Sequence, residues 1–162
     1  MAGSAQRRFI PDDAAEFAAI RRWDLSDFDD WFAHRLCHRW GGEPRVWRHK
    51  MMGFQSNDYL FITNGGAVML AMVLRHVMTG RPVVMEIFAF ARAAPEKDGV
   101  YGATQRTNEG DALKPLYQRL REWAKSMDAT RIYVGVSSDI LPSELRMMMG
   151  SESYYVVGAP CS

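Results

Sequence analysis

Residues 58–92 have the sequence DYLFITNGGAVMLAMVLRHVMTGRPVVMEIFAFAR, and this stretch decides the fold. It holds three apolar runs rich in strand-forming residues, separated by Asn64-Gly65-Gly66 and by Thr79-Gly80-Arg81-Pro82. Both separators have the composition of tight turns. The stretch therefore predicts three consecutive antiparallel strands. Because the runs are apolar on both faces near their centres, we expect helices on both sides of the sheet.

The sequence that follows predicts a helix and a further strand. In EGDALKPLYQRLREWAKSMDATRIYVGVSSD, residues 109–139, apolar residues recur at spacings of 3 and 4, at Leu113, Leu116, Leu120, Trp123 and Met127. This spacing predicts an amphipathic helix, and RIYVGV predicts a buried strand that is parallel to its predecessor if the helix is a crossover. LPSELRMMMG predicts a short helix closed by Gly150, and SYYVV predicts the last strand.

The sequence before the meander predicts two helices. FIPDDAAEFAAIRRW, residues 9–23, has an acidic start and then apolar residues at helical spacing. SDFDDWFAHRLCHRW, residues 26–40, has Ser26 as N-cap and an acidic first turn, and Gly41-Gly42 ends it. RVWRHKMMGF, residues 45–54, fits either a strand or a loop.

Composition indicates one globular domain, residues 1–162, with 48% hydrophobic residues, 24% charged residues and a net charge of +1. This charge gives no reason to expect nucleic acid or an anionic membrane as partner. No apolar run approaches the roughly 20 residues of a membrane span. Cys37 and Cys161 lack metal-type spacing, and His34 and His38 lack a third ligand. We therefore expect a cytoplasmic protein without a metal.

The order of these elements resembles that of the GNAT superfamily of N-acetyltransferases over roughly residues 10 to 158. The residues that carry the resemblance are the central helix with its strand and the segment SDILPSELRMMMGSESYYVV, residues 138–157. The resemblance implies an α/β (α+β) fold. Its mixed sheet would have an antiparallel meander, a crossover helix and a parallel strand, with helices on both faces.

The resemblance also implies acetyl-CoA as substrate. In that family the pantetheine arm pairs with the splayed end of the third meander strand, and a glycine-containing loop before the central helix binds the pyrophosphate. Helix N-termini bind anions because their N–H groups are unsatisfied and the helix dipole is positive there. Carried over to this chain, the cofactor-binding residues would be Phe88, Ala89, Phe90, Ala91, Arg92, Arg106, Thr107, Asn108, Gly110, Asp111, Ala112 and Asp139.

The acidic residues of this loop support a second interpretation. Glu109 and Asp111 flank Gly110, and a carboxylate about 5 Å from a phosphate costs roughly 3 kcal/mol at an effective dielectric near 20. Residues 93–108 are polar and contain glycine, so they predict a long loop. In the alternative, Asn108 or Thr107 caps the helix that follows this loop, and the acids complement its dipole.

Glu86 is the candidate catalytic residue, because the resemblance places it at the level where many members have a general base. Arg146 stands where the usual tyrosine, the candidate acid, would be. A lone carboxylate in an apolar strand is otherwise paired or at a strand end, and Arg75 on the neighbouring strand is a possible partner.

Two functions follow from these residues. The first is an acetyl-CoA-dependent N-acetyltransferase acting on a small amine or a protein amino group; another acyl or aminoacyl donor fits the same fold. The second is a catalytically silent, GNAT-like structural or interaction protein with a protein assembly partner. It would be similar to acetyltransferase-like proteins that bacteriophages package in virions, and it would then be virion-associated.

Overall fold

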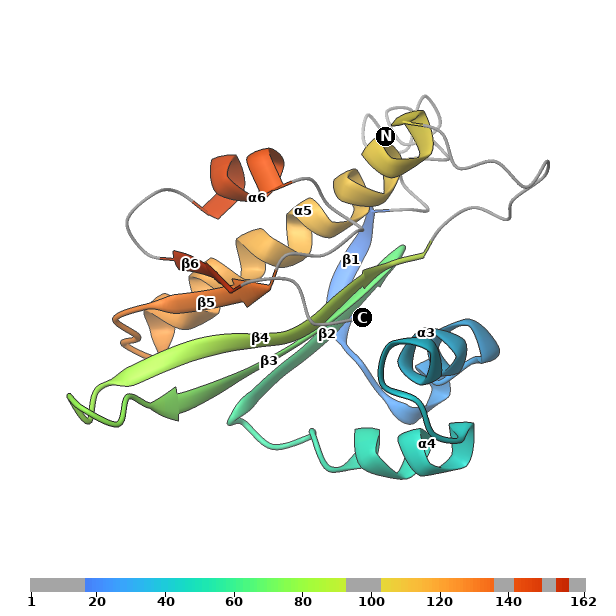
Figure 1. Ribbon diagram of the computed structural model, residues 1–162, viewed down its shortest axis with the longest axis horizontal. Helices are drawn as coiled ribbons and strands as arrows, with labels where there is room; N and C mark the ends of the chain where they lie inside the picture. Colours follow the sequence, from blue (N-terminus) through green and yellow to red (C-terminus); the bar gives the residue numbers. More distant parts are fainter. Residues whose placement is uncertain (1–16, 93–102, 136–141, 150–153, 158–162) are drawn as a thin grey trace, which may run out of the picture.

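The computed structural model describes residues 17–92, 103–135, 142–149 and 154–157, which form a mixed six-stranded sheet with helices (Figure 1). The strands lie in chain order: β1 (Phe17–Arg22), β2 (Tyr59–Gly65), β3 (Ala67–Arg75), β4 (Pro82–Ala91), β5 (Ile132–Gly135) and β6 (Tyr154–Val157). β1 is antiparallel to β2, β2 to β3, and β3 to β4. β5 runs parallel to both β4 and β6. The predicted meander and the predicted parallel strand are confirmed.

Helices cover both faces of this sheet, as predicted (Figure 1). α5 (Ala103–Ser126) and α6 (Pro142–Met149) lie on one face. The other face carries the short 3-10 helix η1 (Leu25–Asp27), α3 (Asp30–Trp40) and α4 (Pro44–Met52). We call these the α5 face and the α3 face.

The core on the α5 face is built from the predicted apolar stripe. Leu113, Leu116 and Leu120 are fully buried, and Trp123 packs partly buried against them. The buried Asn64 ties the β2–β3 turn to α5: its Nδ2 donates to the carbonyl of Ala112 at 3.0 Å, and its Oδ1 accepts two turn N–H groups. Buried polar groups without partners cost about 1–3 kcal/mol, so this side chain fixes the turn on the helix.

The core on the α3 face is aromatic. Trp23 stacks on Phe61 with ring centroids 4.3 Å apart and an interplanar angle of 2°. Phe88 and Phe90 of β4 stack at 4.8 Å. Phe32 of α3 lies between these pairs, so α3 is held by ring packing against β2, β4 and Trp23, which follows β1.

The helix predicted for residues 9–23 is wrong, because residues 17–22 form β1. β1 pairs antiparallel with β2, with Arg21 opposite Thr63 and Arg22 opposite Ile62. The edge of β2 offers backbone partners, and tertiary pairing then outweighs the weak helical propensity of a short segment. Residues 9–16 lie outside the described part of the chain.

The two segments before the meander also differ from the prediction. The N-cap of α3 is Asp29, whose Oδ1 accepts from the N–H of Phe32 at 2.9 Å, while Ser26 lies in η1. Gly41 ends α3 as predicted, with φ of 79°. Residues 44–52 form α4, neither strand nor loop; Pro44 at its first position suits a helix start, and Met51 anchors it in the core.

The helix predicted from the Leu113 stripe begins earlier than expected, at Ala103. The expected loop at residues 93–108 is therefore wrong for residues 103–108, and residues 93–102 lie outside the description. The short helix and last strand are confirmed as α6 and β6, and Gly150 lies outside the described residues.

Candidate functional site

β4 and β5 pair over a short length, and the pairing ends before either strand does. Val84 pairs with Ile132 and Met85 with Tyr133. β5 continues to Gly135, and β4 continues to Ala91 beyond the end of β5 (Figure 1). Among the described strands, β4 beyond Met85 pairs with β3 alone. We call the side of β4 that faces away from β3, from residue 86 to residue 91, the open edge.

Backbone groups of β4 lie along this open edge. The N–H of Arg92 donates to Gly66 on the β3 side, at 2.8 Å. Because alternate residues of a strand direct their N–H and C=O groups to opposite edges, those of Ala91 and Ala89 lie on the open edge. The carbonyl of Ala91 accepts from Nη1 of Arg35 at 3.3 Å. The open edge therefore offers hydrogen-bonding backbone to a bound molecule at Ala89.

A β-bulge at the start of the open edge sets the direction of the side chains. Leu70 of β3 is opposite Phe88, whereas the next residue, Ala71, is opposite Glu86, so Ile87 is the additional residue of β4. The bulge places Phe88 in the aromatic core of the α3 face, while Glu86 contacts α5. Bulges occur often next to active sites, where they redirect a side chain.

Glu86 is half-buried, and three groups hold its carboxyl. The hydroxyl of Tyr117, on α5, donates to Oε2 at 3.0 Å. The backbone N–H of Gly135, at the end of β5, also donates to it, and the guanidinium of Arg39 favours its charged form. Burial outweighs these effects and raises the pKa of Glu86 to about 7. The carboxyl thus titrates near neutral pH, which suits a general base.

The expected partner of Glu86 is wrong. Arg75 lies opposite Pro82 at the far end of the β3–β4 hairpin, and its Nη1 donates to the carbonyl of Gly80 at 2.8 Å. The hairpin turn thus binds the arginine that was expected to neutralise the carboxylate.

Replacing Tyr117 by phenylalanine should raise the pKa of Glu86 further, by about one unit, because the lost hydrogen bond stabilised the carboxylate. A pH titration of the side-chain carboxyl by NMR measures this change. Tyr59→Phe is the matched control, since the Tyr59 ring packs on Phe54 on the other face. An unchanged pKa in Tyr117→Phe would show that this hydroxyl does not act on Glu86.

The strand residues expected to bind the cofactor can do so only through their backbone. Phe88 and Phe90 are buried in the α3-face core, and Ala89 and Ala91 are buried in the α5-face core. Arg92 is exposed, forms an ion pair with Asp29 at 2.5 Å, and has its guanidinium carbon 4.4 Å from the Trp31 ring.

The loop expected to bind pyrophosphate lies inside α5. Thr107, Asn108 and Gly110 follow the first four residues of the helix, so they neither precede it nor cap it; only Arg106 lies in its first four positions. Further along, Ala112 is buried, and Oδ1 of Asp111 accepts from Lys114 at 2.7 Å. Asp139 lies outside the described residues.

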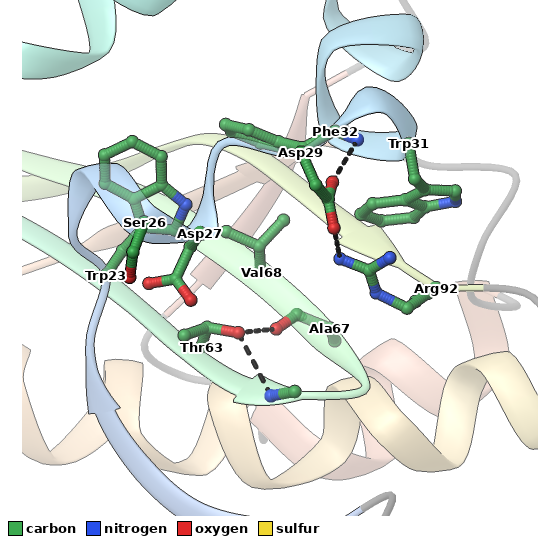
Figure 2. A pocket seen from close by; sticks show the side chains of 11 residues that line it. Trp23, Ser26, Asp27, Asp29, Trp31, Phe32, Thr63, Ala67, Val68 and Arg92 are labelled. Carbon is green, nitrogen blue, oxygen red and sulfur yellow. Dashed lines mark hydrogen bonds and ion pairs between the residues drawn. The ribbon is translucent and has the colours of Figure 1, made fainter.

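A small cavity of about 120 Å³ lies on the α3 face, between the start of α3 and the β2–β3 turn (Figure 2). Its polar side chains already have partners. Asp27 pairs with Arg21, and Asp29 caps α3 and pairs with Arg92. Thr63 donates to the carbonyl of Ala67 at 2.8 Å. We therefore assign this cavity a structural role and place the candidate site at Glu86.

Neither a metal site nor a membrane span is found in the described part of the chain. No three His, Cys, Asp or Glu side chains come together there in a way that could hold a metal. His34 and His38 are exposed, with ring centroids 6.1 Å apart. None of the described helices is long and apolar enough to cross a membrane.

Sequence reasoning missed three of the groups around Glu86: Tyr117, Gly135 and Arg39. Tyr117 carried a usable signal, because a tyrosine within the buried stripe of α5 needs a partner for its hydroxyl.

Comparisons of the chain with protein-family models, with curated proteins and with solved structures find no match.

Proposed function

We propose that this protein is an acetyl-CoA-dependent N-acetyltransferase that acts on a small amine or a protein amino group, with Glu86 as general base. One observation carries the proposal: a half-buried carboxyl with a pKa of about 7 lies where the pairing of β4 with β5 ends, next to the open edge. General bases work best when their pKa is near the operating pH, and perturbed carboxyls concentrate at functional sites.

The proposed role of Glu86 is to take a proton from the acceptor ammonium, directly or through one water. The amine nitrogen then forms a bond to the acetyl carbon, and the carbon–sulfur bond breaks. The hydroxyl of Tyr117 and the N–H of Gly135 orient the carboxyl and keep its pKa from rising further. Acetyl-CoA supplies the activated acyl group; its thiolate leaves and takes up the second proton, which the nitrogen loses as it becomes an amide.

Two parts of the chain support acetyl-CoA as the substrate. The pantetheine arm contains two amides, and the open edge offers backbone groups at Ala89 that can pair with one of them. For the pyrophosphate, α5 offers the N–H groups at its start, from residue 103, which have no acceptor within the helix. We therefore expect phosphate contacts there and not at residues 107–112.

Binding of acetyl-CoA should raise the midpoint of thermal unfolding by about 5 to 10 °C. Ligand at 100 times its dissociation constant stabilises a protein by about 2.7 kcal/mol, and a domain of this size gains about 2–4 °C per kcal/mol. Dephospho-CoA separates contacts to the 3′-phosphate from contacts to the rest of the molecule. No shift at millimolar acetyl-CoA would refute the proposed substrate.

A specific observation favours the second candidate, a catalytically silent structural or interaction protein with an assembly partner. The expected anion-binding loop is replaced by helix, and the buried Ala112 uses its carbonyl to hold the β2–β3 turn. This candidate predicts no thermal shift with any form of CoA. It also predicts that Glu86→Gln keeps its binding to the assembly partner.

A further inference from the structure

Arg39 lies at the C-terminal end of α3, above the strand that carries Glu86. Its guanidinium carbon is 5.0 Å from the centre of the Trp40 ring and 5.9 Å from that of Phe90. Its Nε is buried and has no hydrogen-bond partner among the described residues. In that part of the chain it is the one buried side-chain nitrogen or oxygen without a partner. A buried donor without a partner costs about 1–3 kcal/mol, so this arrangement calls for a ligand that accepts.

A second arginine of α3 lies beside the same ring as Arg39. Arg35, one turn earlier on α3, has its guanidinium carbon 4.6 Å from the same Phe90 ring. Arg39 acts electrostatically on Glu86 and favours its charged form, but burial still raises the pKa of Glu86 to about 7. The guanidinium of Arg39 lies beside an apolar ring and interacts with a carboxyl whose pKa is raised, and this arrangement favours the binding of an anion.

Arg39 and Glu86 lie on opposite faces of β4 and interact electrostatically. No described strand pairs with β4 along the open edge that lies between them. A molecule at the open edge can therefore present one group to Glu86 on the α5 face and another to Arg39 on the α3 face.

We propose that Arg39 binds a carboxylate of the acceptor, so that the acceptor is a small molecule carrying both an amine and a carboxylate. This inference rests on the proposed function and names its substrate class. A guanidinium matches a carboxylate with two parallel hydrogen bonds. A phosphate dianion is disfavoured because it would be repelled more strongly by the ionised form of Glu86. The ring of Trp40, which is 43% exposed, offers a flat apolar wall beside the bound group.

The test compares α-amino acids with their α-carboxamides as acceptors, because the pair differs only in the charged group. Arg39→Gln should raise KM for the amino acid about 10- to 100-fold and change kcat less than about threefold. It should leave KM for the carboxamide unchanged. Arg39→Lys should restore part of the affinity, since lysine keeps the positive charge but cannot form the two parallel hydrogen bonds of a guanidinium. Arg48→Gln, an exposed arginine on α4, is the matched control and should change nothing.

A binding measurement separates this inference from the proposed function. The same amino acids and carboxamides are titrated, without acetyl-CoA, into the wild-type protein and Arg39→Gln, and binding is followed by NMR. Amino-acid binding that is lost in Arg39→Gln supports the inference even if no acetyl transfer occurs, in which case the proposed function fails alone. Carboxamides that bind and react as well as the acids, or binding that does not depend on Arg39, would overturn the inference and leave the function standing.

Discussion

Glu86→Gln is expected to lower kcat for acetyl transfer by about 10²- to 10³-fold at neutral pH, because a positioned general base contributes about 10²–10⁴ to the rate. Glutamine keeps the shape and can still accept from Tyr117, but it cannot take up a proton. The remaining rate should rise with pH up to the pKa of the acceptor amine, without the inflection near pH 7 that Glu86 gives the wild type. Steady-state rates from pH 5.5 to 9 measure both effects.

The control for this substitution is Glu122→Gln, which changes an exposed carboxyl on α5 that pairs with Arg119. It should leave both the rate and the pH profile unchanged. If Glu86→Gln retains the wild-type rate, Glu86 is not the base, and the search moves to the parts of the chain outside the described residues.

The pH dependence of stability shows whether Glu86→Gln is folded. The folded-state pKa of Glu86, about 7, lies above its ordinary value of 4.5. Its contribution to stability is therefore fully present below about pH 4.5 and is lost as pH rises through 7. This pKa difference corresponds to a change of at most about 3 kcal/mol in the free energy of unfolding. Glu86→Gln should thus be more stable than the wild type at pH 8.5 and nearly equal to it at pH 5, as measured by urea unfolding.

The parts of the fold that the sequence predicts are those with local signals. The turn at Asn64-Gly65-Gly66 and the helical spacing of the apolar residues in α5 depend on neighbouring residues, and the sequence predicts both. β1 and α4 were not, because their stability comes from distant partners: β1 pairs with β2, and Met51 anchors α4 in the aromatic core. Short segments of this kind follow tertiary context more than their own propensity.

The sequence likewise predicts only those parts of the candidate site that have local signals. The position of Glu86 on the strand could be inferred, but the hydroxyl that holds it comes from a residue 31 positions away. The bulge at Ile87 could not be predicted, because no glycine or proline stands next to it in the sequence. Gly110 indicated a loop, yet it lies inside α5. A helical glycine costs about 1 kcal/mol, which the burial of Ala112 and Leu113 next to it offsets.

Phe32→Ala is expected to have the largest effect on stability, a loss of about 3–5 kcal/mol in the free energy of unfolding. Phe32 is 1% exposed, and its ring centroid lies between 5.6 and 6.5 Å from those of Trp23, Phe28, Phe61, Phe88 and Phe90. Removing the ring leaves a cavity between α3 and the sheet that the flat neighbouring rings cannot fill. Urea unfolding measures the loss, and Phe32→Leu, which keeps most of the volume, should lose less.

Phe28→Ala is the matched control, because Phe28 packs at the margin of the same cluster and is only partly buried. Its loss should be about half or less of that in Phe32→Ala; equal losses would contradict a central role for Phe32. Phe32→Ala also distinguishes the two faces of the candidate site. α3 carries Arg39, whereas Tyr117 and Gly135 hold Glu86 from α5 and β5. Below its unfolding temperature, Phe32→Ala should therefore weaken acceptor binding through Arg39 while the inflection near pH 7 stays in place.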